Sequence, residues 1–153
     1  MAANLALTAY LHALLDRAKQ YVDPAPELVI VAPGAEVAWD NCCGQLWARV
    51  VDFGPPSGAR QVRKADGSLC AMRRQAQIEL GMLRCAAVVD DHGRAPTAEE
   101  ISADGAQVLA DAEGLWLLLS CEVSVREVVK WTPVGPSGGC VGGHWRFTVD
   151  LGD

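Results

Sequence analysis

The sequence predicts an α+β domain: an antiparallel sheet with a long β-hairpin and two helices packed on one of its faces. Three stretches carry this prediction: apolar residues at helical spacing over 5–19, strict alternation over 75–82, and a helix-capping sequence that starts at Thr97. A chain of 153 residues is the size of one domain and can bury about two-thirds of its unfolded surface. We therefore expect a single domain over residues 1–153, in the order helix, three strands, helix, two strands.

The first helix is predicted from a period of 3.6 residues. Residues 5–19 place apolar side chains at i, i+4, i+7, i+8 and i+11 along one face: Leu7, Leu11, Leu14, Leu15 and Ala18. The segment lacks the basic n-region of a signal peptide and carries charged residues where a cleavage site would lie, so we expect a helix of the mature protein. Pro24 and Pro26 end helical geometry, and the apolar segment 28–31 is expected to be a strand.

The long hairpin is predicted from two alternating segments. Residues 45–53 alternate, and the proline- and glycine-rich run 54–58 ends that strand. A polar loop follows, and residues 75–82 then alternate polar and apolar side chains, which indicates one wet face and one buried face. The hairpin tip is expected at about residues 54–67.

The second helix begins with a capping box, in which Thr97 accepts from the first turn and Glu100 reaches back. One face is expected to hold the apolar residues Ile101, Val108, Leu109, Ala112 and Trp116. Gly105 and Gly114 weaken a helix interior by about 1 kcal/mol each. The alternating segments 128–132 and 145–151 are expected to pair as the last two strands.

The charge balance argues against a protein that wraps DNA. The formal net charge is −6, whereas phosphate neutralisation needs a basic face. One local basic cluster interrupts the acidic average: Arg60, Arg63, Lys64, Arg73 and Arg74. Its plain interpretation is a solvated loop, and its alternative is a binding patch. No apolar run reaches the roughly 18 residues of a membrane span.

Six cysteines offer several kinds of chemistry: Cys42, Cys43, Cys70, Cys85, Cys121 and Cys140. Buried thiols are the default expectation for a protein made in a reducing compartment, with disulfides closing later as an alternative. A zinc site built on Cys140 and His144 is less favoured, because no close pair such as C-x2-C is present. Asn41-Cys42-Cys43-Gly44 resembles the nucleophile stretch of NlpC/P60 cysteine peptidases, but a strand is expected after it where that family has a helix.

Other catalytic patterns are weak. Residues 135–139 fit G-x-S-x-G, but a second strand rather than a helix is expected after them, and the run lacks the ending of a P-loop. The acidic pairs at 90–91, 99–100 and 111/113 are expected in loops or on the helix surface. We therefore expect no enzymatic activity, no cofactor and no metal.

The glycine-rich run near the C-terminus is expected to be a turn between the last two strands. Its glycines can adopt positive φ angles, and its proline restricts the backbone where the chain enters the turn. The residues expected in the turn are Gly135, Pro136, Gly138, Gly139, Gly142 and Gly143. Four tryptophans are expected to pack, with the last two facing each other across the strand pair: Trp39, Trp47, Trp131 and Trp145.

Two stretches together, VAWDNCCGQLWARV at 37–50 and VKWTPVGPSGGCVGGHW at 129–145, resemble the small neck and tail-completion proteins of long-tailed phages that infect actinobacteria. The tail terminators are the nearest in pattern. The resemblance implies a structural virion protein of the head–tail neck, made in the host cytoplasm. It would form a homo-hexameric ring between the head-completion (stopper) ring and the tail-tube protein, stop tube growth and dock the filled head.

The same resemblance implies that genomic DNA passes through the ring without specific binding, and an acidic wall would repel phosphate. The hairpin tip, with Arg60, Arg63 and Lys64, is the expected contact with a neighbouring ring. Two alternatives remain open: a head-completion (stopper) protein, and an NlpC/P60-like cysteine peptidase that uses Cys42 or Cys43.

Overall fold

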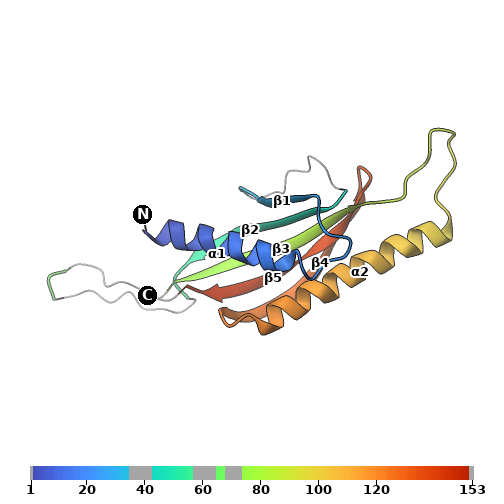
Figure 1. The fold of residues 1–153 in the computed structure, drawn as a ribbon. Helices are drawn as coiled ribbons and strands as arrows, with labels where there is room; N and C mark the ends of the chain where they lie inside the picture. The colour runs from blue at the N-terminus through green and yellow to red at the C-terminus, as the bar shows by residue number, and fades with distance from the viewer. Residues whose placement is uncertain (1, 35–42, 57–64, 68–73, 152–153) are drawn as a thin grey trace.

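The computed structural model describes residues 2–34, 43–56, 65–67 and 74–151 and confirms the α+β class (Figure 1). Its elements follow the predicted order: α1 (Ala2–Ala18), β1 (Leu28–Val31), β2 (Gln45–Gly54), β3 (Gln75–Cys85), α2 (Ala98–Cys121), β4 (Val125–Ser137) and β5 (Cys140–Asp150). The basic residues Arg60, Arg63 and Lys64, together with Trp39 and the candidate nucleophile Cys42, lie outside the described residues.

The five strands form one sheet in the order β1-β2-β3-β5-β4. All neighbours are antiparallel except β1 and β2, which run parallel, so the expectation of a wholly antiparallel sheet is wrong at this edge. The reason is the connection between them, residues 32–44, which has the dozen or so residues that a return to the same end of the sheet requires.

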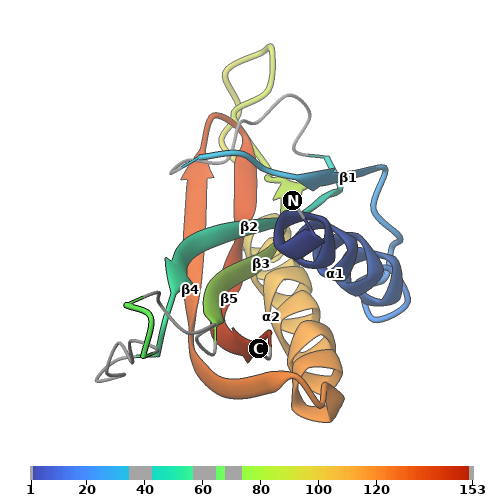
Figure 2. The ribbon, with the colours of Figure 1, turned by 90° about the vertical axis from the view of Figure 1, so that its left-hand side faces the viewer.

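Both helices pack on the same side of the sheet (Figure 2). The predicted face of α1 is confirmed, since Leu11, Leu14 and Leu15 are at most 3% exposed. They share one core cluster with α2 and with the central strands: Leu115, Leu118, Leu119, Leu46, Ala48, Ala76, Ile78, Leu80, Met82, Phe147 and Val149. This cluster is the apolar interior of the protein.

The capping box of α2 is confirmed, but the predicted apolar face is partly wrong. Thr97 Oγ1 accepts from the Glu100 amide at 3.2 Å, and the Glu100 carboxylate accepts from the Thr97 amide at 2.7 Å. Ile101 and Leu109 are instead 58% and 63% exposed. The buried stripe consists of Val108, Asp111, Ala112, Leu115, Leu118 and Leu119. Because residues 108–119 are apolar nearly all round, periodicity alone did not fix which stripe faces the sheet.

The last hairpin is longer and tighter than predicted. β4 runs to Ser137 and β5 starts at Cys140, so only Gly138 and Gly139 form the turn, both with positive φ. Gly135 and Pro136 belong to β4, where the register shifts.

Gly142 and Gly143 belong to β5, which corrects their assignment to the turn. A Cβ on Gly142 would lie 1.9 Å from the Met82 carbonyl oxygen, and one on Gly143 would lie 2.4 Å from the Trp131 ring. These two glycines therefore allow close packing within the sheet.

Candidate interaction surface

The sheet face away from the helices carries a buried charge cluster. Arg49, Glu79 and Arg146 lie side by side on β2, β3 and β5. The Glu79 side chain is 1% exposed, and its carboxylate accepts from Arg49 Nε at 2.5 Å and from Arg146 Nη2 at 2.6 Å. His144 Nε2 lies 3.4 Å from the same carboxylate. Alternation placed Glu79 on a wet face, and that expectation is wrong because three cationic or basic side chains enclose it.

These contacts set the protonation of the cluster. Burial raises the pKa of Glu79, but the hydrogen bonds from Arg146 and Arg49 outweigh burial and hold that pKa below its usual value. Burial lowers the pKa of His144, against the opposing effect of Glu79. Glu79 is therefore ionised at neutral pH, and both of its oxygens are occupied. The cluster ties three strands together and presents no open acid or base.

Trp47 lies on the same face of the sheet, next to the charge cluster. It is 3% exposed and lies across Gly81, where a Cβ would come within 2.6 Å of the indole ring. Its ring centroid is 5.4 Å from that of His144. Trp47 thus packs within the sheet face.

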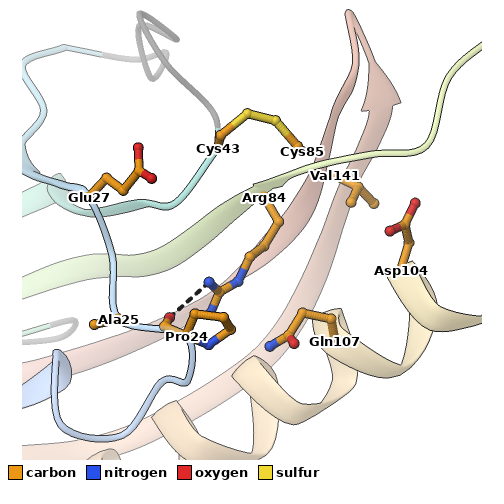
Figure 3. A pocket seen from close by; sticks show the side chains of 9 residues that line it. All are labelled: Pro24, Ala25, Glu27, Cys43, Arg84, Cys85, Asp104, Gln107 and Val141. Atoms are coloured by element: carbon orange, nitrogen blue, oxygen red, sulfur yellow. Dashed lines mark hydrogen bonds between the residues drawn. A yellow bond between two sulfur atoms is a disulfide. The ribbon is translucent and has the colours of Figure 1, made fainter. Parts of the chain in front are cut away.

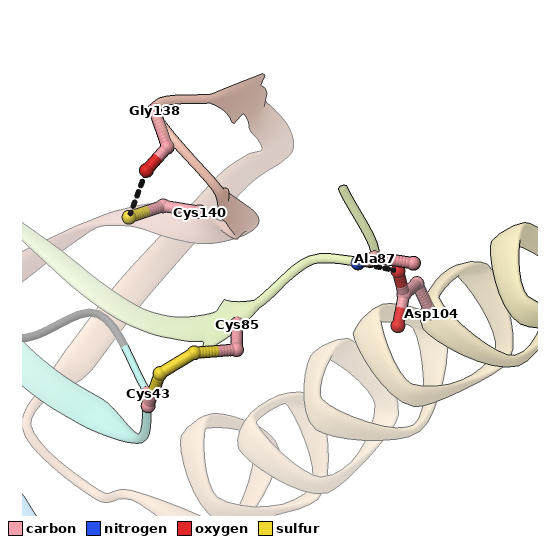
Figure 4. The surroundings of a disulfide bond; sticks show 6 residues. All are labelled: Cys43, Cys85, Ala87, Asp104, Gly138 and Cys140. Atoms are coloured by element: carbon pink, nitrogen blue, oxygen red, sulfur yellow. Dashed lines mark hydrogen bonds between the residues drawn. A yellow bond between two sulfur atoms is a disulfide. The ribbon is translucent and has the colours of Figure 1, made fainter. Parts of the chain in front are cut away.

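Cys43, Cys85 and Cys140 lie at one end of the sheet (Figure 4). Cys43 and Cys85 form a disulfide between the start of β2 and the end of β3. Cys140 stands opposite Cys85 in the β3–β5 register and is also disulfide-bonded. The expectation of free thiols is wrong for these three residues, and Cys43 meets Cys85 because the β2–β3 register places Gln45 opposite Leu83. Cys121 is an exposed free thiol.

This placement weakens the alternative chemistries. Cys43 carries no thiol in this structure, and β2 rather than a helix begins at Gln45, so Cys43 has no helix dipole to activate it. His144 faces Glu79, four residues along β5 from Cys140. Among the described residues, no group of three or more potential ligands is arranged to hold a metal ion. The G-x-S-x-G run has the form strand, turn, strand.

A hollow of ≈ 330 Å³ lies between β3, α2 and the segment before β1 (Figure 3). Its floor is Arg84, which makes a bidentate ion pair with Asp111 at 2.7 and 2.8 Å and donates to the Pro24 carbonyl at 2.8 Å. Asp111 was expected on the helix surface and is instead 2% exposed. Gln107 bonds the Asp23 carbonyl, and Asp104 accepts from the Ala87 amide. The polar groups of this hollow that could hold a ligand are largely committed to the fold.

A second hollow is lined mainly by apolar and aromatic side chains. The tryptophan groove, ≈ 400 Å³, lies between α2 and strands β4 and β5 and is lined by Leu109, Ala112, Glu113, Trp116, Trp131 and Trp145. Trp145 stands between the other two tryptophans, with ring centroids 5.2 Å from Trp116 and 5.6 Å from Trp131. Its Nε1 donates to the Ala112 carbonyl at 2.8 Å, which fixes the ring. The groove is therefore a preformed aromatic surface.

The outer face of α2 extends this apolar surface. Between Gly105 and Ser120 the only charged residues are Asp111 and Glu113, and Asp111 is buried. Leu109, Trp116 and Leu117 are 63%, 44% and 57% exposed. A helix that is apolar on all sides is normally covered on all sides, and large exposed apolar patches mark binding surfaces. The run of apolar residues in the sequence already indicated this surface, but the sequence prediction assigned Leu109 and Trp116 to the buried side of the helix.

The sequence matches no protein-family model, and no curated protein shows significant similarity to it. Within the part of the chain that the structure describes, neither helix is long and apolar enough to cross a membrane.

Proposed function

We propose that the protein is a tail terminator, a structural virion protein that forms a hexameric ring at the head–tail junction of a long-tailed phage. The ring caps the tail tube, stops its elongation and gives the DNA-filled head its docking surface. Its partners are further copies of the chain, the head-completion protein on one side and the tail-tube protein on the other. It is not an enzyme and carries no cofactor.

The observation that carries this proposal is the exposed apolar surface of α2 and the tryptophan groove. A subunit that remained alone would expose Leu109, Trp116 and Leu117 to water. Ring formation supplies a permanent cover, since each subunit of a closed ring buries two surfaces. A ring protein also needs no reactive group, and the buried Glu79 cluster offers none.

Two further features support a neck ring. The stretches 37–50 and 129–145 resemble tail terminators, and the second of them contains Trp131 and Trp145 of the groove. The formal charge of −6 suits a wall past which DNA moves without binding.

The test is electron microscopy of lysates from a phage with a nonsense mutation in this gene. The proposal expects filled heads beside separate tails of uncontrolled length, with normal particles when the gene is supplied in trans. Filled heads beside tails of normal length would instead indicate the head-completion (stopper) role. Complete virions that adsorb but fail to infect would reject a neck role and favour the peptidase.

A further inference from the structure

The tryptophan groove combines three indole rings with one acid. Trp116 lies on α2, Trp131 on β4 and Trp145 on β5, and the planes of the first two rings are tilted by 45° and 59° from that of Trp145. Of the described residues that line the groove, Glu113 is the only charged one, and it is exposed. An occupant of the groove must therefore suit aromatic rings and a carboxylate together.

The chain itself does not neutralise the carboxylate of Glu113. Among the described residues, none donates a hydrogen bond to this carboxylate, and no Lys, Arg or His lines the groove. Lys130 and Arg146 stand opposite each other in the β4–β5 register, on the sheet face away from α2. Glu113 and Trp116 are three residues apart on the helix, so their Cβ atoms lie about 5–6 Å from each other. One bound group can therefore touch the carboxylate and an indole ring at once.

This chemistry selects a cation over other classes of occupant. Glu113 would repel an anion such as a DNA phosphate, and the Trp145 N–H that could hold an anion donates to the Ala112 carbonyl instead. A purely apolar occupant would remove water from the carboxylate without giving it a partner. A cation, in contrast, is attracted by the negative faces of indole rings and pairs with the carboxylate.

Among cations, an arginine side chain fits this groove best. Its guanidinium group is planar and weakly hydrated, so it can stack on an indole ring while its edge donates to a carboxylate, whereas an ammonium group is a strongly hydrated point charge. The apolar surface also continues beyond the groove, since Leu117 is 57% exposed and does not belong to the lining. A free small cation would leave Leu117 uncovered. A protein segment can carry apolar residues on either side of the arginine.

We propose that the tryptophan groove binds an arginine side chain that a partner protein presents between apolar residues. The three indole rings provide the stacking surface, and Glu113 provides the counter-charge. This site rests on the proposed function for the presence of a partner, because every subunit of a neck ring has protein neighbours. It goes further by giving the chemistry of the contact.

The test is a titration of the isotope-labelled full-length chain, followed through the NMR signals of the tryptophan side-chain N–H groups. The first probe is the peptide Ac-Leu-Arg-Leu-NH2. The second has citrulline, a neutral side chain of nearly the same shape, in place of arginine. The third is N-acetylarginine amide, which lacks the leucines. Trp47, which is 3% exposed and lies on the other face of the sheet, is the internal reference.

The arginine peptide should shift the signals of Trp116 and Trp131 and leave that of Trp47 unchanged, with a dissociation constant of about 1 mM or below. The citrulline peptide should bind about tenfold more weakly, because it lacks the positive charge. N-acetylarginine amide should bind about fivefold more weakly than the arginine peptide, because it covers no apolar surface outside the groove.

Two substitutions separate the contributions of the acid and the ring. Glu113→Gln should weaken binding of the arginine peptide about threefold. Trp116→Leu should weaken it about fivefold, since leucine is apolar but has no aromatic ring. Glu99→Gln is the matched control, because Glu99 is an exposed acid in the first turn of α2 outside the groove, and it should bind as wild type. Thermal unfolding of all three variants should stay close to that of the wild type, since the replaced side chains are exposed.

Four results would overturn the arginine site. Equal affinity for the arginine and citrulline peptides would show a plain apolar groove, and equal affinity for the arginine peptide and N-acetylarginine amide would show a site for free small cations. A Glu113→Gln variant that binds as tightly as Glu99→Gln would show that the carboxylate does not recognise the cation. Groove signals that move on dilution of the protein alone and do not respond to the peptide would show that a second copy covers the groove.

The nonsense lysates report separately on the proposed function. Tails of normal length together with arginine-specific binding would reject the terminator and keep the arginine site. Tails of uncontrolled length together with equal binding of the arginine and citrulline peptides would do the reverse.

Discussion

The two faces of the sheet are both buried at their centre, yet by different chemistry. On β3, Ile78 faces the helices and Glu79 faces away, and each residue is 0% exposed. Ile78 stands opposite Phe147, in an interior that two helices cover. Glu79 stands between Arg49 and Arg146, whose own side chains cover it together with His144. Burial on the second face thus comes from ion pairs in the plane of the sheet.

This difference has energetic consequences. The helix-covered face gains stability in proportion to the apolar area removed from water, with little dependence on pH. The second face depends on a few directional contacts, and loss of one member leaves a buried charge without its partner. The two faces should therefore respond differently to substitution and to acid.

The largest effect is expected on the helix-covered face. Phe147→Ala removes a ring that is 0% exposed and should lower the free energy of unfolding by about 3–5 kcal/mol. Phe53→Ala is the control, because Phe53 is also a strand residue but 45% exposed, and its effect should be much smaller. Urea unfolding measures both, and equal losses would contradict the assigned core.

On the second face, Glu79→Ala should lower the free energy of unfolding by about 2–4 kcal/mol, because Arg49 and Arg146 lose their shared acceptor. Glu79→Gln keeps one acceptor oxygen and should cost less. Glu113→Ala, an exposed acid on α2, is the control and should be close to neutral. A Glu79→Ala variant as stable as the control would show that the cluster contributes nothing to stability.

Substitution of Gly81, on the second face, should lower the free energy of unfolding. A Cβ at Gly81 would lie 2.6 Å from the Trp47 ring and 2.7 Å from the Gly143 carbonyl oxygen, so Gly81→Ala should cost about 1–3 kcal/mol. Gly54→Ala, also in a strand but with nothing within 4 Å, should be tolerated. Thermal unfolding and tryptophan fluorescence would report the change, and an unaltered Gly81→Ala would refute the close contact.

The smallest effect is the pH dependence that the second face contributes. The pKa of Glu79 is lowered in the folded state from 4.5, so its stabilisation is complete above 4.5 and is lost as pH falls through the lower folded value. His144 has its folded pKa lowered from 6.5, so stability also falls as pH drops from 6.5 toward that lower value. Urea midpoints measured from about pH 7 to about pH 3 should show both losses.

Glu79→Gln should flatten the acidic part of this profile. A residual slope will remain from Asp16 and Glu100, whose pKa values are lowered by hydrogen bonds from Lys19 and from the Thr97 backbone. An unchanged profile in Glu79→Gln would show that protonation of Glu79 does not cause the loss of stability in acid. Phe147→Ala should shift the whole curve down without changing its shape.

Local sequence signals predicted the elements well. The leucine spacing of α1, the capping box at Thr97 and the alternation of β3 each depend on residues a few positions apart, and the structure has all three elements. The exposed surface of α2 was predicted less well. Leu109 and Trp116 are apolar and were assigned to the core, because periodicity finds apolar stripes but does not show which stripe has a partner.

The sequence by itself determined the α+β class, the order of the seven elements and an acidic formal net charge of −6. These properties follow from composition and from short-range periodicity. Tertiary structure alone decided which polar residues are buried, since Glu79 and Asp111 meet Arg49, Arg146 and Arg84 only through strand register and helix packing. It also joined Cys43 to Cys85, and it left the groove beside Trp145 uncovered. Contacts between residues tens of positions apart depend on how elements pack, and no local pattern encodes that packing.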